Sequence, residues 1–414
     1  MDFLAHPFWD KFVEFEERFD AHDRVFAILS RVIHIPMHQY ARYFEKYRQL
    51  AASRPVAELA PADMIARFRG ELDLQGPDGH EAERALRTRI DNYHLEIFHT
   101  TQAETTKRWT FESEIKRPYF HVTELDDAQL ENWRKYLDFE ESEGDYTRTN
   151  FLYERCLVTC AHHDDLWERF VRWMFAQEGK EEEVRNIYIR ACCLYTPIAR
   201  PAIRLMWALF EEMSDRPSVA SAIYEGILVA LPGELEAIVG LANLQHRQVG
   251  YEAAVQVFQQ YINSAECSND TKGALVAEMA KLAWKDQGNV EEARNIFQSQ
   301  QQAYTDSEPF WASFLDFEMQ QPATAKVHAE QNQRVKAVHD SISRRTRLSP
   351  EGTRQLSHTY MRYLTTRRDK AAAREYMALD AEVNGPASVV SVMKSKTALA
   401  AKGVPTNGHT AAAA

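Results

Sequence analysis

The sequence contains little glycine, proline or cysteine, and each shortage excludes a class of fold. Only 15 Gly and 15 Pro occur among 414 residues, too few for the many tight turns of an all-β sandwich or barrel. Five cysteines are a small and odd number for a disulfide framework, which favours the reducing cytosol or nucleus. No stretch approaches ~18 uncharged apolar residues, and the first residues (MDFLAHPFWDKF) do not resemble a signal peptide. A helical protein that neither spans a membrane nor is secreted is therefore expected.

The sequence also lacks the short motifs of common catalytic sites. No G-x-G-x-x-G, Walker A, G-x-S-x-G or H-E-x-x-H pattern occurs. A phosphate-binding loop, a nucleophile elbow and a zincin helix are therefore not expected. We predict that the protein is not an enzyme and has no catalytic, cofactor-binding or metal-binding residues.

Positive charge is scarce overall but concentrated in one segment. The formal net charge of −12 disfavours a surface that binds nucleic acid throughout, because phosphates need a positive field. Residues 326–374 nevertheless hold twelve Lys or Arg against four Asp or Glu. Two clusters there could converge on one face of a helical hairpin: Arg344, Arg345 and Arg347, then Arg367, Arg368 and Lys370. Guanidinium groups suit phosphates or acidic surfaces, so these are candidate contacts for a protein partner or RNA, with an ordinary solvated face as the alternative.

Aromatic residues recur at helical spacing, which is the most informative pattern in the sequence. Three copies have aromatic residues at i, i+3 and i+6 followed by glutamate: Trp9, Phe12, Phe15 and Glu16; Trp133, Tyr136, Phe139 and Glu140; Trp311, Phe314, Phe317 and Glu318. Looser copies are Trp167, Phe170 and Trp173, and Trp207 with Phe210. Such stripes are typical of buried helix faces, so we predict that these aromatic residues form the repeat core, with base-stacking platforms as the alternative. The acid after each triplet is expected to cap or pair with a neighbouring helix.

A second helical pattern follows each stripe and defines the repeat length. It centres on an aliphatic and an aromatic residue: Leu152 and Tyr153, Ile187 and Tyr188, Ile223 and Tyr224, Val257 and Phe258, Ile296 and Phe297. The aromatic member recurs after 34 to 39 residues, which is one helix-turn-helix unit. Such units bury their apolar faces only against neighbouring units. The predicted fold class is therefore all-α, an α-solenoid.

Turn and breaker residues divide this array. Glycines that permit positive φ past a helix end separate the two helices of successive units, at Gly144, Gly179, Gly250 and Gly288. Helix breakers at Pro55, Pro61 and residues 74–79 interrupt the repeats. We predict five parts: the end of an N-terminal repeat array at 1–50, a linker at 51–80, a long connecting helix at 81–108, a C-terminal array at 109–383 and a disordered tail at 384–414.

A metal site is the main alternative that the side-chain chemistry offers. Ligand types that zinc prefers occur at Cys156, Cys160, His162 and His163, with Cys192 and Cys193 one repeat later. Cysteines buried between packed helices explain the same residues, and we prefer that interpretation. His34 and His38 stand at i and i+4, but Pro36 breaks the helix that would align them.

The repeats resemble a known family. The Glu-closed triplet, with the second helix that carries Tyr-Glu-Arg-Cys at 153–156, resembles the half-a-TPR (HAT) repeat of RNA-processing scaffolds. KRWTFESEIKRPYFHVTELDDAQLENWRKYLDFE at 107–140 is more specific and is similar to the pre-mRNA-processing factor 39 family, HAT-repeat components of the U1 snRNP. IHIPMHQYARYFEKYRQLA at 33–51 and LMWALFEEM at 205–213 share this likeness. Family members usually carry several more repeats before the position where this chain begins, so we expect that it lacks them.

The resemblance implies a non-catalytic nuclear scaffold, without cofactors, that supports 5′ splice-site recognition through contacts with U1 snRNP proteins. It also implies dimerisation through the C-terminal repeats, as a homodimer or with a related HAT protein, and only indirect RNA contact. A scaffold for mRNA 3′-end cleavage, a direct RNA-binding protein and a metal enzyme that uses the Cys/His group are the alternatives.

The last predicted hairpin offers a face for such a dimer. A solenoid ends in one unpaired helical face, which is either polar or covered by a partner. The hairpin has apolar residues at helical spacing: Leu356, Tyr360, Tyr363 and Leu364, then Tyr376 and Leu379. We predict that these residues form the dimer face, with the neighbouring arginines as a basic rim.

Overall fold

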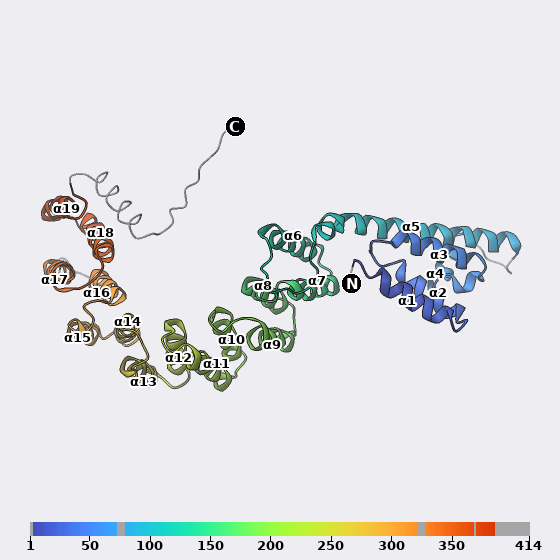
Figure 1. Cartoon of the computed structure of the whole chain (residues 1–414). Coiled ribbons are helices and arrows are strands. Elements are labelled where there is room, and N and C mark those ends of the chain that lie inside the picture. Colours follow the sequence, from blue (N-terminus) through green and yellow to red (C-terminus); the bar gives the residue numbers. More distant parts are fainter. Residues whose placement is uncertain (1–2, 73–78, 322–327, 368–369, 386–414) are drawn as a thin grey trace. The chain divides into compact units, whose positions relative to one another are not determined.

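The regular structure of the chain is helical throughout the part described by the computed structural model, residues 3–72, 79–321, 328–367 and 370–385 (Figure 1). The chain divides into two compact units, residues 1–196 and 197–414. Within each unit, helices that follow one another in the sequence pack side by side. These stacked helical hairpins confirm the predicted all-α solenoid.

The first unit combines short helices, one long helix and two hairpins. Its first half consists of α1 (His6–Glu17), α2 (His22–Val32), α3 (Tyr40–Ala52), the 3₁₀ turn η1 (Val56–Glu58), α4 (Ala62–Glu71) and α5 (His80–Glu114). Two hairpins follow: α6 (Asp127–Glu143) with α7 (Tyr146–Thr159), and α8 (Asp164–Phe175) with α9 (Glu181–Arg190), which continues into the π-helical turn η2 (Ala191–Tyr195). The predicted linker at 51–80 therefore contains η1 and α4, whereas residues 73–78 of its breaker run lie outside the described residues. The division into five parts remains a prediction.

The described residues of the second unit form five successive hairpins. They are α10 (Ala202–Met213) with α11 (Pro217–Ala230), α12 (Leu235–Gln248) with α13 (Tyr251–Asn263), α14 (Asn269–Lys285) with α15 (Val290–Gln300), α16 (Glu308–Gln320) with α17 (His328–Arg345), and α18 (Pro350–Thr366) with α19 (Lys370–Val383). Within this unit, the first helix of each hairpin lies on the inner side of an arc and the second on the outer side (Figure 1). Most of the predicted tail, residues 386–414, lies outside the described residues.

Glycine ends the first helix of several hairpins in the way that the sequence predicts. Gly144, Gly179 and Gly288 have φ angles of 76°, 68° and 66°, and Gly250 has a φ of 126°. A residue with a Cβ would be strained in this left-handed region. The helical hairpins can therefore turn within a few residues.

The aromatic stripes supply much of the core, together with the aromatic residues of the second helices. Trp133, Trp167 and Trp311 are almost fully buried, and the indole N–H groups of Trp167 and Trp311 donate to Ala161 O and Tyr304 O, both at 2.9 Å. Rings from consecutive hairpins stack on each other, as do Phe297 of α15 and Phe314 of α16 at a centroid distance of 4.8 Å. Trp9, Tyr136, Phe170, Phe210, Phe314 and Phe317 are also buried, whereas Phe139, Trp173 and Trp207 are half-buried.

The first stripe differs from the prediction at two positions. Trp9 is buried, but Phe12 and Phe15 are 37% and 54% exposed, so the core role expected for these two side chains is wrong. The reason is the orientation of α1, which turns Trp9, Val13 and Glu16 toward its neighbours. On the opposite side, Phe12 and Phe15 contact only the aromatic rings of α1 itself and of the turn after it, as far as the ring contacts of the described residues show.

A glycine on α12 allows a close approach between two helices, and this leads to a prediction. A Cβ at Gly240 would lie 2.5 Å from Cε1 of Tyr224, whereas one at Gly226 on α11 would meet no atom within 4 Å. We expect Gly240→Ala to lower the free energy of unfolding by about 1–3 kcal/mol through overpacking. The control Gly226→Ala should raise it by about 0.5–1 kcal/mol through helix propensity. Urea denaturation measures both, and equal effects of the two substitutions would contradict this packing.

Two buried histidines make the stability depend on pH. His94 contacts Tyr47 Oη and Leu59 O, each at 3.0 Å, and His339 contacts Ser357 Oγ at 3.1 Å. Burial lowers the pKa of both rings below 6.5. Above pH 6.5 their stabilisation is fully present, and it is lost as the pH falls from 6.5 toward the folded-state pKa, because the unfolded chain binds protons more readily.

We therefore expect the urea midpoint to decrease as the pH is lowered from 7.5 to 5.5. The free energy of unfolding should decrease by up to about 1.4 kcal/mol per pH unit for each histidine. The variant His339→Gln should be less stable at pH 7.5 but should show a shallower pH dependence. A midpoint that is equal at both pH values would contradict the burial of neutral rings.

Candidate functional site

The predicted basic residues occupy two separate places in the last two hairpins. Arg344 and Arg345 end α17, Arg347 lies in the following turn, and all three side chains are exposed. Arg367 follows the end of α18, and Lys370 begins α19 with an exposed side chain. Arg368 lies outside the described residues.

These two clusters do not converge on one face, which corrects the expectation from the sequence. The 17 residues of α18 lie between them, and a helix of that length spans about 25 Å. Arg367 is also engaged within the chain, because its Nη1 lies 3.6 Å from Oε2 of Glu375 and its side chain is only 15% exposed. Of the six predicted cations, those that the structure describes as exposed to a partner are Arg344, Arg345 and Arg347 at one end of α18, and Lys370 beyond the other.

The residues of the predicted dimer face are buried or partly buried, contrary to the expectation. Leu356, Tyr360 and Leu364 are almost fully buried in the core that joins α18 to α16 and α17. Tyr360 stacks on His339 with a centroid distance of 4.4 Å and donates to Glu375 Oε1 at 2.9 Å. Tyr363, Tyr376 and Leu379 are partly buried against the same core. These apolar residues hold the hairpin together, so the prediction that all six form an exposed interface is wrong.

The terminal hairpin presents a different surface to its surroundings. Met377 on α19 is 65% exposed. A groove of about 540 Å³ lies between the two helices, and its lining includes Arg354, His358, Arg362 and Asp380. This surface is mixed in character rather than apolar, because the carboxylates of Glu351 and Asp380 lie among these basic groups.

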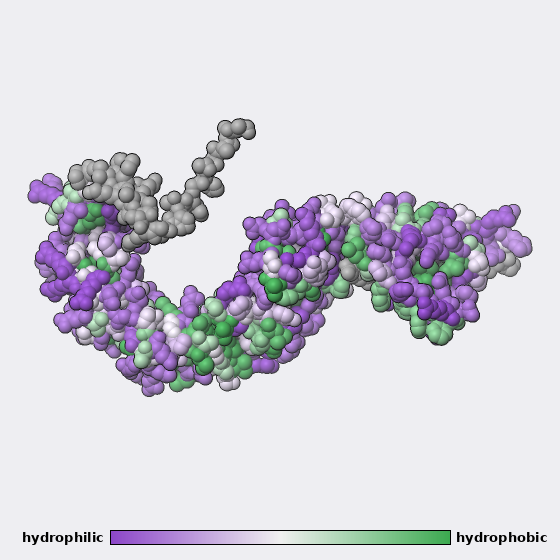
Figure 2. Space-filling view, viewed as in Figure 1, coloured by the Kyte–Doolittle hydropathy of each residue, from purple (hydrophilic) through white to green (hydrophobic). Residues whose placement is uncertain are grey.

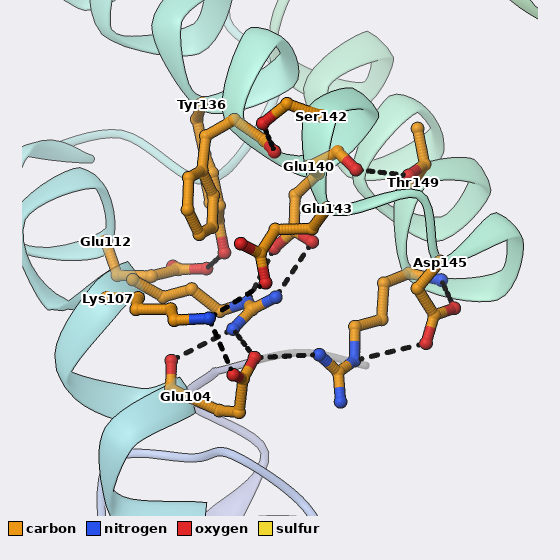
Figure 3. Close-up of polar contacts among 12 residues, drawn as sticks. Glu104, Lys107, Glu112, Tyr136, Glu140, Ser142, Glu143, Asp145 and Thr149 are labelled. Carbon is orange, nitrogen blue, oxygen red and sulfur yellow. Dashed lines mark hydrogen bonds and ion pairs between the residues drawn. The ribbon is translucent and has the colours of Figure 1, made fainter.

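A network of charged and polar side chains joins α5, α6 and α7 in the first unit (Figure 3). Arg108 on α5 donates to both carboxylate oxygens of Glu140 on α6, at 2.6 and 3.0 Å, and both side chains are about 97% buried. Arg108 also contacts Glu104, which in turn accepts from Lys107 at 2.9 Å and Arg148 at 3.1 Å. Bidentate contacts of this kind fix the angle between helices as well as compensate the buried charge.

A second buried cluster continues the network toward α7. Tyr136 donates to Glu112 at 2.9 Å, and Arg155 donates to both oxygens of the same carboxylate, at 2.7 and 3.0 Å. Burial, followed by the charge of Glu112, raises the pKa of Tyr136. Burial also acts to raise the pKa of Glu104, but the hydrogen bonds from Lys107 and Arg108 outweigh it and lower that pKa to about 2. Glu104 therefore stays charged at neutral pH, and the paired side chains form a rigid connection between α5, α6 and α7.

The glutamate that closes each aromatic triplet has the same structural role in three places. Glu16, Glu140 and Glu318 are all buried and accept from an arginine of another helix: Arg24 at 3.3 Å, Arg108 at 2.6 Å and Arg294 at 2.7 Å, respectively. Glu211 is buried as well and accepts from the indole N–H of Trp207 at 2.9 Å. The sequence indicates the acid but not its partner, because the arginine is on the following helix for Glu16 and on the preceding helix for Glu140 and Glu318.

The cysteine and histidine residues do not assemble a metal site in the described part of the chain, where no three His, Cys, Asp or Glu side chains are close enough to hold an ion. Cys156 and Cys160 are buried between helices, and burial raises the pKa of the Cys156 thiol. His162 lies at the surface, where its Nδ1 contacts Tyr195 O at 2.9 Å. No described helix is long and apolar enough to cross a bilayer.

Stacked helical hairpins with internally satisfied charges define an α-solenoid of the HAT-repeat class, and comparison with known proteins agrees. The PRP39 C-terminal HAT repeat family matches residues 106–247, and the PRP39 N-terminal HAT repeat family matches residues 1–49. Pre-mRNA-processing factor 39 of Schizosaccharomyces pombe is 47% identical over 407 residues, which cover 94% of this chain and 66% of that protein. The chain belongs to the pre-mRNA-processing factor 39 family.

Two further relatives are more distant. Pre-mRNA-processing factor 39 of Xenopus laevis is 29% identical over 77% of this chain and 52% of that protein. The U1 small nuclear ribonucleoprotein component PRP42 of Saccharomyces cerevisiae is 20% identical over 46% of this chain and 36% of that protein. The chain thus spans between half and two thirds of the length of the two factor 39 relatives.

Proposed function

We propose that this protein is a non-catalytic scaffold of the U1 snRNP that supports 5′ splice-site recognition through protein contacts in the nucleus. The observation that carries the proposal is the 47% identity to a pre-mRNA-processing factor over 94% of the chain. The similarity to a U1 snRNP component supports the choice of particle. The buried polar groups described above pair with one another inside the fold, which suits a structural role better than a catalytic one.

Purification of the tagged full chain from nuclear extract tests the proposal, with RNA and proteins identified in the eluate. U1 RNA and U1 proteins should be enriched over the same purification with an unrelated helical-repeat protein. Enrichment of mRNA 3′-end cleavage factors without U1 RNA would favour the alternative HAT scaffold and contradict the proposal.

We also propose that the terminal hairpin mediates dimerisation, as a homodimer or with a related HAT protein. Its exposed surface combines Met377 with the groove between α18 and α19, and the exposed Arg344, Arg345 and Arg347 precede α18 in the sequence. The rest of the protein is acidic, so a second copy offers carboxylates to these arginines. A stable dimer should bury about 1,600 Å² in total.

Substitution of two exposed residues provides the prediction for this dimer. We expect Arg362→Glu combined with Met377→Glu to convert the dimer to a monomer at tens of micromolar. Both substitutions introduce carboxylates that lose their water in the interface and repel the carboxylates of the second copy. Deletion of residues 386–414 should leave the dimer intact, as should Val249→Glu at an exposed site on another hairpin. Light scattering measures the mass, and a wild-type chain that is monomeric at this concentration would contradict the proposal.

A further inference from the structure

A second groove, separate from the terminal hairpin, lies on the inner helices of the second unit. It has a volume of about 590 Å³ and is lined by residues of α10, α12, α14 and α16, with Tyr224 of α11 at its wall. Adjacent packed helices are about 8–10 Å apart, so four of them present a surface of about 30 Å. An extended chain of about nine residues covers that length.

The wall of this groove is held in a fixed shape. The ring of Tyr224 approaches α12 closely because Gly240 has no side chain. Arg247 on α12 donates from Nε and Nη2 to both carboxylate oxygens of Glu212, at 2.7 and 2.6 Å. A ligand therefore meets a preformed surface, which lowers the entropic cost of binding.

The groove is apolar where α10 and α12 line it. Leu209 is 53% exposed there, although a leucine on a helix of a packed array is usually covered. Leu205, Leu235 and Val239 lie beside it and are partly buried. Figure 2 shows hydrophobic residues gathered over α10 and α11. Exposed apolar area that lines a concave surface is typical of a site for another protein.

Asn243 offers an unpaired side-chain amide to the groove, as far as the described residues show. Asn243 on α12 is exposed in the groove, and its amide makes no hydrogen bond with any of the residues that the structure describes. A side-chain amide donates and accepts at the same time, which is the pattern of a peptide backbone. An extended peptide therefore satisfies Asn243 while its side chains contact Leu209 and Val239.

The charges of the groove favour a peptide over RNA. The two cations of its lining are both neutralised within the chain, Arg247 by Glu212 and Lys281 by Glu278, with Nζ–Oε2 at 3.1 Å for the latter pair. Glu236 is exposed in the lining and has no ion pair among the described residues. A phosphate backbone would meet a net negative field here, whereas a basic side chain would find a carboxylate.

We propose that this groove binds an extended peptide segment of a protein partner, with apolar side chains over Leu209 and Val239, a backbone contact to Asn243 and a basic residue near Glu236. The proposal rests on the scaffold function and specifies the kind of partner segment that the scaffold binds. It does not depend on which RNA-processing machine the scaffold serves.

A phage-displayed library of random 12-residue peptides, selected on the full chain, provides the test. Selected sequences should combine apolar residues with Lys or Arg, and synthetic peptides should bind in fluorescence polarisation. Leu209→Glu should weaken binding at least tenfold, and Asn243→Ala about threefold or more. Glu236→Lys should weaken binding of the basic peptides at least threefold. The control Val229→Glu changes an exposed valine of α11 outside the groove and should leave the affinity unchanged.

Four outcomes of this selection would contradict the proposal. They are a selection without binders, binders that tolerate Leu209→Glu, an acidic consensus sequence, or RNA binding that is lost in Leu209→Glu. A change from dimer to monomer in Leu209→Glu would assign the groove to a second copy and equally overturn the proposal. Circular dichroism melting of each variant excludes loss of fold as the cause, and purification of U1 particles by the full chain reports separately on the scaffold function.

Discussion

Arg108→Met is expected to lower the free energy of unfolding of the first unit by about 3–5 kcal/mol, because it leaves the carboxylate of Glu140 buried without a cation. Glu140 is 3% exposed, and the guanidinium of Arg108 donates to both of its oxygens. Methionine keeps most of the volume of the arginine side chain, so the loss reports on the charge rather than on a cavity. Urea denaturation followed by circular dichroism measures the change.

The double variant Arg108→Met with Glu140→Leu is the control for this prediction. Removing both charges eliminates the uncompensated carboxylate, so the double variant should be more stable than Arg108→Met alone. Glu104 keeps Lys107 and Arg148 as partners in either variant. If Arg108→Met is as stable as the wild type, or if the double variant loses more than the single one, the network does not compensate a buried charge as described.

Phe317→Ala should destabilise the second unit by about 3–5 kcal/mol through the cavity that it leaves. Phe317 is 2% exposed and contacts the rings of Trp284 and Phe297 at centroid distances of 5.2 and 5.4 Å. Because units of a solenoid are coupled only to their neighbours, amide hydrogen exchange should accelerate first in α14 to α17. Trp133→Ala should have an effect of the same size in the first unit.

Phe15 offers a matched control, because it has the same place in its stripe as Phe317 but is 54% exposed. Phe15→Ala should change the free energy of unfolding by less than about 0.5 kcal/mol. A loss in Phe15→Ala as large as that in Phe317→Ala would show that α1 is packed differently. Melting of Phe317→Ala at the wild-type midpoint would refute the stripe as a core.

The helices and most of their buried faces can be predicted from the sequence because they depend on local periodicity. Trp133 and Trp311 recur with the same spacing before the same acid, and only a helix places three such rings on one side. The hairpin turns are similarly local, since Gly144 and Gly288 are at positions that require a positive φ.

Features that depend on the packing of several helices could not be predicted in this way. The sequence predicts that Arg367 converges with Arg345 on one face of a hairpin, but the length of α18 separates them and Glu375 neutralises Arg367. The sequence also predicts that Tyr360 lies on an exposed terminal face, but α16 and α17 cover it. The exposed amide of Asn243 has no signature in the sequence, because its environment is made by helices from four different hairpins.

Co-sedimentation of the purified chain with U1 particles tests the central claim most directly. We expect the full chain to move with purified U1 snRNP in a density gradient, and to remain at the top when protein-free U1 RNA replaces the particle. This result would show that protein contacts recruit the scaffold, as the acidic net charge and the internally paired arginines lead us to expect. The account would be contradicted if the chain does not co-sediment with the particle, or if it binds the protein-free RNA equally well.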